Sequence, residues 1–339
     1  MTQEQAIFFF EKHFGQPADE CIILAQSGSS RVNFKASNAT CDYIITFNEN
    51  LRENESFLYF SEVFGSLKLN TPNIYVVSED RKLYIQEFLG TKTLSDVISE
   101  EGVSKRVKTL VMQTLEKLFA LQTKTADRID YHKTFEYESY DELPVMHDLY
   151  YFKSFIADVL DLEYHKSTLL KEFKEITKLI ESLVPKGLML RDFQARNIMV
   201  NDVDKVSFID YQSAMKGPLM YDVISFLFQA KANFTEQFKT EMLEFYINLF
   251  EDEETKVQLK NSVQPIQLMR FLQVLGAYGL RGLVQRKKHF IASIGKGIEN
   301  ITAFTEKWDE MKNYPELLNV IRQLNSDKTK IKIEEILNH

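Results

Sequence analysis

The sequence predicts a two-lobed α+β protein, with a small β-rich N-terminal lobe (residues 1–90) and a larger helical C-terminal lobe (residues 91–339). Three observations support this prediction. The chain has 339 residues, 44% of them hydrophobic, which is too long for one small domain. Short strand-like runs with polar turns between them fill the chain up to Gly90. Beyond Gly90, apolar residues recur at three and four positions, which is the helical pattern.

The N-terminal lobe is expected to be mostly strands with one inserted helix. An amphipathic helix over Thr2–Phe14 comes first. Polar turns such as QSGSSR (26–31) and SEDRK (78–82) separate the strands that follow. The runs predict strands around residues 21–25, 32–36, 43–47, 74–77 and 83–88, and a helix over 53–64.

The C-terminal lobe is expected to be helical apart from one β island over residues 188–212. The glycines at 276, 279 and 282 recur every three positions, and close packing between helices is the expected reason. The predicted helices cover residues 105–122, 148–162, 169–184, 221–232, 236–250 and most of 263–307.

Composition excludes several classes of protein. The net charge is −8, and an acidic chain is a poor binder of nucleic-acid backbones. Two cysteines, Cys21 and Cys41, cannot form a disulfide framework or a Cys-rich zinc site. No run is long and apolar enough to span a membrane, and the N-terminus lacks the features of a signal peptide. We expect a cytoplasmic protein without nucleic-acid or membrane partners, and its oligomeric state stays open.

The β island carries the residues that indicate chemistry. In LMLRDFQARNIMV (188–200), charged and amide side chains stand between two apolar runs. Asn197 follows Asp192 by five positions, and Asp210 ends the next hydrophobic run, VSFI. If the two strands pair, Asp192 and Asp210 lie at neighbouring loops.

This set fits phosphoryl transfer. One carboxylate must accept or orient the proton of the attacking hydroxyl. A second carboxylate and an amide oxygen must hold Mg²⁺, a hard cation that prefers oxygen ligands and is completed by phosphate oxygens. The catalytic loop of protein kinases has the same order of parts. Asp residues capping two loops are the alternative explanation, but the Asn197 spacing disfavours it.

The two segments also resemble a known family. LRDFQARNIMV and FIDYQSAMKGPLMYDVISFL resemble the two catalytic motifs of the aminoglycoside phosphotransferase and choline kinase superfamily, which has a protein-kinase-like fold. The form RDFQxRN…IDxQ…KGPxxYD looks most like the bacterial kinases that phosphorylate N-acetylmuramate and N-acetylglucosamine at the anomeric hydroxyl. RFLQVLGAYGLRGLVQRKKHF (270–290) looks like a late helix of those kinases.

The resemblance implies ATP and Mg²⁺ as cofactors and a role for each matching residue. Asp192 would be the catalytic base, with Arg191 beside it pairing with a carboxylate. Asn197 and Asp210 would hold Mg²⁺. The remaining implied residues are Gln212 and Asp222 as active-site support, and Asp148 and Arg196 as contacts of the acceptor. Leu190 replaces the leading His of the superfamily motif.

The nucleotide site departs further from the family pattern. Protein kinases place a lysine on the third strand of the small lobe, and YIITFNE (43–49) has none. Lys35 or Arg31 could replace it, with Lys35 favoured, and Glu53 or Glu55 could be its helix partner. The expected nucleotide contacts are Ser27, Gly28 and Ser29 in the turn, Lys35, and the hinge residues Gln86, Glu87 and Phe88.

The predicted function is ATP- and Mg²⁺-dependent phosphorylation of a small molecule, with a sugar or amino sugar as the expected acceptor. An aminoglycoside or choline is the alternative acceptor. A nucleotide-binding pseudokinase is the alternative from another class, because the strand lysine and the leading His are absent.

Overall fold

The computed structural model describes residues 1–25 and 31–338 of the chain. The described chain forms two compact units, each built from two stretches of sequence. The first unit comprises Met1–Glu138 and Gly187–Met215, and the second comprises Ser139–Lys186 and Lys216–His339. The predicted α+β class, with one β-rich part and a helical majority, is confirmed.

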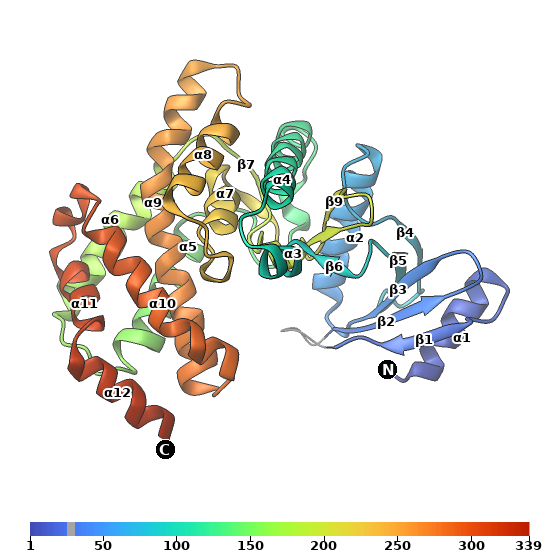
Figure 1. Ribbon diagram of the computed structural model, residues 1–339, viewed down its shortest axis with the longest axis horizontal. Coiled ribbons are helices and arrows are strands. Elements are labelled where there is room, and N and C mark those ends of the chain that lie inside the picture. Colours follow the sequence, from blue (N-terminus) through green and yellow to red (C-terminus); the bar gives the residue numbers. More distant parts are fainter. Residues whose placement is uncertain (26–30, 339) are drawn as a thin grey trace. The chain divides into compact units, whose positions relative to one another are not determined.

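A five-stranded antiparallel sheet is the centre of the first unit (Figure 1). Its strand order is β1-β2-β3-β5-β4. Helix α1 (Gln3–Phe14) covers the sheet by packing Phe10 against the buried side chains of Phe34 and Ile45. The strands are β1 (Glu20–Ile23), β2 (Val32–Ser37), β3 (Asp42–Phe47), β4 (Ile74–Val77) and β5 (Leu83–Glu87).

Helix α2 (Leu51–Ser66) is inserted between β3 and β4. Asn50 caps it by accepting from the backbone N–H of Glu53, which satisfies one of the free donors at a helix start. Its apolar face is aromatic, with Phe57, Phe60 and Phe64 buried. The expected helix over 53–64 is confirmed, and the cap moves its start to Leu51.

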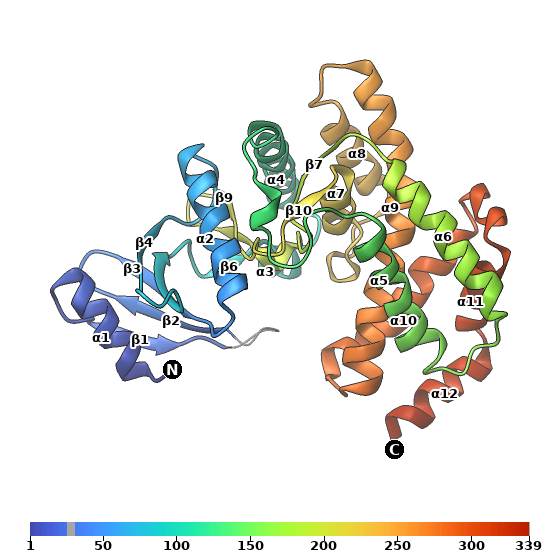
Figure 2. The ribbon, with the colours of Figure 1, turned by 180° about the vertical axis from the view of Figure 1, so that it is seen from behind.

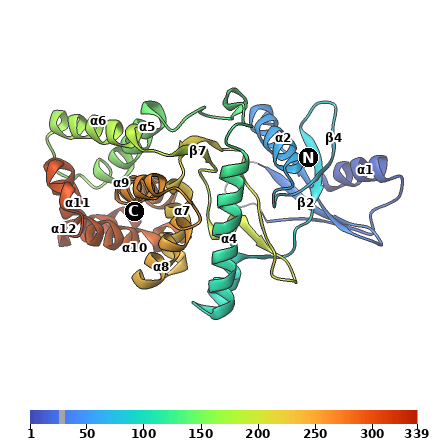
Figure 3. The same ribbon diagram turned by 90° about the horizontal axis from the view of Figure 1, so that it is seen from above.

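A second, three-stranded sheet in the first unit has the order β6-β8-β9. Its strands are β6 (Lys92–Thr93), β8 (Ile198–Val200) and β9 (Val206–Phe208). Helix α4 (Lys105–Lys124) runs past this sheet (Figure 3). A hydrogen bond connects the helix to β9: Lys117 Nζ donates to the Val206 carbonyl at 2.8 Å. Between β6 and α4 lies helix α3 (Leu94–Glu101), which sequence periodicity missed. Its Thr93–Asp96 capping box was the available signal.

The second unit is helical. Helix α9 packs against both α5 and α10 within it (Figure 2). A side chain at Gly279 would place Cβ 2.1 Å from the Phe155 carbonyl oxygen, and one at Gly276 would approach the Phe152 nitrogen to 2.9 Å. Close packing therefore accounts for these two glycines, as predicted. The helices are α5 (Glu142–Phe152), α6 (Lys166–Ser182), α7 (Met220–Leu227), α8 (Glu236–Ile247), α9 (Glu253–Tyr278), α10 (Lys288–Thr305), α11 (Pro315–Leu324) and α12 (Asp327–Asn338).

Two helix boundaries in this unit differ from expectation. The predicted helix over 148–162 begins at Glu142, because Asp141 caps it by accepting from Leu143 N–H. The long run over 263–307 is two helices, α9 and α10, separated by a π-helical turn over Gly279–Val284. Pro265 lies inside α9 without ending it.

The remaining strands, β7 (Lys186–Met189) and β10 (Met215–Pro218), lie where the chain passes between the units. The predicted lobe boundary near Gly90 stays a prediction. Strand β5 ends at Glu87, and α3 and α4 belong to the same compact unit as the sheet. Over residues 1–25 and 31–338, no helix has the length and apolar character needed to cross a membrane.

Candidate active site

The loop between β7 and β8 carries Asp192. The backbone at Arg191 has a φ of 71°, and Asp192 N–H donates to the Leu190 carbonyl at 2.8 Å, which closes a tight turn. A 3-10 turn over Ala195–Asn197 then leads into β8. The predicted pairing of Arg191 with a carboxylate stays a prediction.

The Asp192 carboxylate is held by its own loop and remains reachable. It accepts from Gln194 Nε2 at 2.6 Å and from Arg196 Nη2 at 2.9 Å. The Asp192 side chain is 34% exposed. Arg196, predicted to contact the acceptor, therefore pairs with Asp192, the predicted catalytic base.

Asn197 joins the two aspartates. Its buried amide Nδ2 donates to the Asp192 backbone carbonyl at 2.8 Å and to Asp210 Oδ2 at 3.3 Å. The antiparallel β8–β9 pair makes this possible, because Ile198 lies opposite Phe208 and Ile209 N–H donates to the Asn197 carbonyl at 3.0 Å. The structure thus brings Asp192, Asn197 and Asp210 together, as the strand pattern predicted.

Asp210 follows β9 in a left-handed backbone conformation, with a φ of 63°. Its Oδ1 accepts from Gln212 Nε2 at 3.1 Å and from the guanidinium of Arg31. Burial by itself would raise the pKa of the Asp210 carboxyl, but the Arg31 charge and these hydrogen bonds outweigh it and hold the pKa below its usual range. Gln212 contacts Asp210, and its supporting role stays a prediction.

Arg31 is the candidate cation that the sequence analysis ranked below Lys35. Its side chain is 13% exposed and contacts Asp210, Gln212 Oε1 at 3.3 Å and Glu53 Oε1 at 3.4 Å. Sequence reasoning favoured Lys35 instead. Lys35 Nζ pairs with Asp42 at 2.9 Å and lies 5.0 Å from the centre of the Phe88 ring.

The two candidate helix carboxylates, Glu53 and Glu55, have different partners. Glu53 contacts Arg31 and accepts from Asn48 Nδ2 at 2.8 Å. Glu55 pairs instead with Arg81, and half of its side chain is exposed. Of the two alternatives left open by the sequence, the contacts favour Glu53.

The predicted hinge follows the last strand of the sheet. Gln86 Nε2 donates to Thr46 Oγ1 at 3.0 Å, and Glu87 Oε2 accepts from Asn73 Nδ2 at 2.7 Å. The polar side chains are therefore engaged within the protein. Strand β5 ends at Glu87, and the nucleotide contacts of Gln86, Glu87 and Phe88 stay predictions. The predicted contacts Ser27, Gly28 and Ser29 lie outside the described residues.

Asp148 and Asp222 belong to the second unit. Asp148 is buried and accepts from the Tyr140 hydroxyl at 2.8 Å. Asp222 lies fully buried in the first turn of α7. These surroundings are those of structural carboxylates. The acceptor role of Asp148 and the supporting role of Asp222 stay predictions.

The donor set fits a magnesium ion bound together with phosphate. Over the described ranges, no cluster of three or more His, Cys, Asp or Glu could hold a metal by itself. Asp210 and Asn197 supply a carboxylate and an amide oxygen, since the Asn197 nitrogen is the atom that faces Asp192. Two hard oxygen ligands completed by phosphate are a common arrangement for Mg²⁺.

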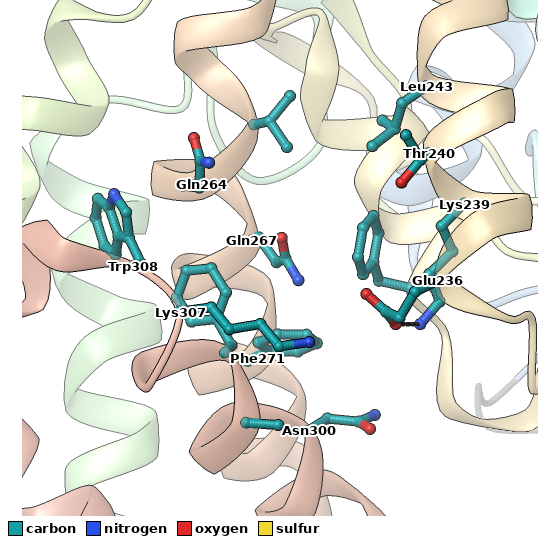
Figure 4. Close-up of a pocket in the computed structure, with 14 residues that line it drawn as sticks. Glu236, Lys239, Thr240, Leu243, Gln264, Gln267, Phe271, Asn300, Lys307 and Trp308 are labelled. Carbon is teal, nitrogen blue, oxygen red and sulfur yellow. Dashed lines mark hydrogen bonds and ion pairs between the residues drawn. The ribbon is translucent and has the colours of Figure 1, made fainter.

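The second unit contains a separate cavity of about 270 Å³ (Figure 4). Phe271 and Trp308 supply aromatic walls, and the amides of Gln264 and Gln267 lie at its edge. Helices α8, α9 and α10 provide most of its lining. Neither Asp148 nor Arg196 is a lining residue, so the cavity does not contain the predicted acceptor contacts.

Comparison with known families and curated proteins gives two matches. A family model described as "Phosphotransferase enzyme family" matches residues 24–259, more than half of the chain. An N-acetylmuramate/N-acetylglucosamine kinase of Neisseria meningitidis serogroup B is 24% identical over 181 residues. That match covers 52% of this chain and 51% of the relative, so the chain spans about half the length of the curated relative it matches.

Solved structures share the fold at low identity. Choline kinase LicA from Streptococcus pneumoniae has a TM-score of 0.61 at 14% identity, covering 89% of this chain and 100% of that one. An ethanolamine kinase of Plasmodium vivax has a TM-score of 0.58 at 16% identity, covering 90% and 87%. An aminoglycoside phosphotransferase in ternary complex with ADP and hygromycin B has a TM-score of 0.59 at 13% identity, covering 89% and 98%.

Proposed function

This chain belongs to the phosphotransferase enzyme family, and from that premise we propose that it transfers the γ-phosphoryl group of ATP to a hydroxyl of a small molecule. The observation that carries the proposal is that the Asn197 side-chain amide donates hydrogen bonds to both Asp192 and Asp210 and so holds the three residues together. A loop aspartate, an asparagine five residues later and a strand-end aspartate are the parts that phosphoryl transfer requires.

In the proposed reaction, the acceptor hydroxyl oxygen attacks the γ-phosphorus in line with the bond that breaks. A new P–O bond forms, the bond from the γ-phosphorus to the β,γ-bridging oxygen breaks, and ADP leaves. The hydroxyl proton goes to Asp192, whose carboxylate is partly exposed and held by Gln194 and Arg196. Positioning of this kind supplies much of the rate enhancement in phosphoryl transfer.

Asp210 and Asn197 would hold Mg²⁺, which when bound neutralises charge on the phosphates. The surroundings of the Asp210 carboxylate suit a metal ligand. Gln212 holds Asp210 in place, and the lowered pKa of the Asp210 carboxyl is consistent with an ionised ligand. Support for ATP as the donor also comes from the ADP bound to the aminoglycoside phosphotransferase.

A sugar or amino sugar is the proposed acceptor, with the anomeric hydroxyl as the reacting group. The motif form and the Neisseria meningitidis relative support this choice. An aminoglycoside, choline or ethanolamine is the second candidate, because structures with those acceptors in their names share the fold. Those likenesses are too distant in sequence to choose the acceptor.

The test is an ADP-release assay over amino sugars, neutral hexoses, aminoglycosides, choline and ethanolamine. We expect turnover with an amino sugar, and ³¹P NMR of the product should show whether the phosphate is on the anomeric oxygen. Asp192→Asn is the background control. MgATP binding without phosphate transfer to any member of the panel would contradict the proposal and favour a nucleotide-binding protein without turnover.

A further inference from the structure

Strand β3 provides no cation to the nucleotide site. The position expected to carry a lysine in a kinase small lobe falls at Thr46 or Phe47. Thr46 is buried, donates to Asn33 Oδ1 at 2.7 Å and accepts from Gln86. Its hydroxyl is therefore part of the packing of the sheet, and the charge must come from elsewhere.

Arg31 lies between the helix carboxylate Glu53 and the strand-end carboxylate Asp210, where a kinase places its strand lysine. One guanidinium contacts a carboxylate of α2, Glu53, and the strand-end carboxylate, Asp210. This is the arrangement that a strand lysine has in a protein kinase, where it pairs with a helix glutamate beside the metal aspartate. Here the cation comes from the residue immediately before β2 instead. Lys35, further along β2, is held by Asp42 and Phe88.

The two carboxylates that Arg31 bridges are fixed to each other by other contacts. Ser56 Oγ in α2 donates to the Gln212 carbonyl at 2.8 Å, and Ser61 Oγ lies 2.7 Å from the Tyr211 hydroxyl. The Phe57 ring stacks on the Tyr211 ring at 4.9 Å between centres. Asp210 and Glu53 therefore keep their places if the Arg31 side chain moves.

Both oxygens of Asp210 are already occupied by donors of the chain. Oδ1 accepts from Arg31 and Gln212, and Oδ2 accepts from Asn197. A divalent cation uses the same lone pairs and is repelled by a guanidinium in contact with them. Arg31 on Oδ1 therefore opposes Mg²⁺ binding at Asp210 by charge repulsion and by competition for an oxygen, while Glu53 remains available to Arg31 if it withdraws.

We infer that Arg31 is the phosphate-binding cation of this enzyme in place of the strand lysine, and that in the nucleotide-free protein it occupies Asp210 and opposes metal binding there. This inference rests on the proposed function. When the nucleotide arrives with its metal, the guanidinium leaves Asp210, keeps Glu53 and donates to phosphate oxygens. A guanidinium fork suits this exchange because carboxylate and phosphate present similar pairs of oxygens.

The test measures two affinities that should change in opposite directions. In Arg31→Gln, Mn²⁺ alone, followed by the EPR signal of the free ion, should bind about tenfold more tightly, a change equivalent to one pair interaction of ~1.4 kcal/mol. MgAMP-PNP, measured by calorimetry, should bind about tenfold more weakly because the phosphates lose a charged donor. A purely structural role would weaken both affinities or neither.

Arg81→Gln is the matched control. It removes another arginine paired with a carboxylate of α2, Glu55, and should change neither affinity. Arg31→Lys retains the charge beside Asp210 and is the variant to measure if Arg31→Gln unfolds. It should weaken MgAMP-PNP binding by roughly threefold or more, because an ammonium lacks the fork, and leave Mn²⁺ binding close to wild type.

Any folded Arg31→Gln protein without both opposite changes overturns the inference, as does an Arg31→Lys protein that binds MgAMP-PNP like wild type. Neither measurement uses an acceptor. Failure of every acceptor in the assay above would therefore overturn the proposed function, and these two affinities would still report on Arg31 separately.

Discussion

At the scale of single residues, two aspartates of the candidate site have different surroundings. Asp192 is partly exposed and held by polar side chains of its own loop. Asp210 is held by Arg31, Gln212 and Asn197, and its pKa is lowered. The first arrangement suits a group that meets an acceptor, and the second suits a permanently ionised ligand.

Asp192→Asn should separate the base from the metal ligands. The change keeps the shape and removes the proton acceptor, so the single-turnover rate should fall by about 10²–10⁴-fold, the usual contribution of a positioned acid or base. MgATP affinity, measured by calorimetry, should remain close to wild type because Asn197 and Asp210 are intact. A loss of nucleotide affinity as large as that of Asp210→Asn would make Asp192 a metal ligand or a structural anchor.

Asp210→Asn should abolish transfer while the protein stays folded. Asn tolerates the left-handed backbone at this position as well as Asp does, so the turn after β9 should survive. The lost charge removes the main magnesium ligand, and the Mg²⁺ dependence of the residual rate should flatten. Far-UV circular dichroism checks the fold, and activity within a few fold of wild type would remove Asp210 from the mechanism.

At the scale of elements, helix α2 packs closely against the segment that follows β9. Phe57 stacks on Tyr211, and two serines of α2 bond to the 211–212 segment. This contact joins the helix that carries Glu53 to the strand end that carries Asp210.

Glu53→Gln and Glu55→Gln form a matched pair on this helix. Glu53→Gln removes one of the two carboxylates on Arg31 and should raise the KM for ATP by about tenfold, the scale of one partly buried charge pair. Glu55→Gln breaks only the exposed pair with Arg81, which is worth little. Steady-state kinetics decides, and equal effects of the two variants would contradict the assignment of Glu53.

The contact between α4 and β9 predicts a pH effect on stability. Burial, with a smaller contribution from the charge of Lys205, lowers the pKa of Lys117 to about 8 in the folded protein. The unfolded chain keeps the ordinary pKa near 10.4, so between these pH values it binds a proton that the folded chain has lost, and the free energy of unfolding rises with pH.

Lys117→Met should remove this rise. Urea unfolding at pH 7.5 and 9.5 gives the measurement, because the stability difference between wild type and variant should shift in favour of wild type as the pH increases. Comparison with the variant cancels the other groups that titrate in the same range. A difference that is constant with pH would contradict the lowered pKa of Lys117.

At the scale of the whole molecule, nucleotide binding should stabilise the fold, in part through the proposed Mg²⁺ ligands Asn197 and Asp210. MgATP at about 100 times its Kd should add roughly 2.7 kcal/mol to the free energy of unfolding, by mass action. In Asp210→Asn, ATP should stabilise less, and equally with and without Mg²⁺. Thermal unfolding with ATP, with and without Mg²⁺, measures this, and a full magnesium effect in the variant would place the metal elsewhere.

The sequence by itself determined the fold class, most of the elements and which residues meet in the candidate site. Periodicity is a local property, and Asn197 and Asp210 lie only 13 positions apart across one antiparallel strand pair, so spacing alone could bring them together. Caps were the missed local signals, as at Asp141 and in the Thr93–Asp96 box.

Only the tertiary structure separates the contacts of Arg31 from those of Lys35, and the contacts of Glu53 from those of Glu55. Arg31 meets Asp210 across 179 positions of sequence, and which side chain reaches that carboxylate depends on how the five-stranded sheet and α2 pack around Tyr211. Each candidate is a charged residue in a suitable segment, so composition and spacing could not separate them. The physical reason is that an ion pair is chosen by distance in space, and long-range distances are set by packing rather than by local pattern.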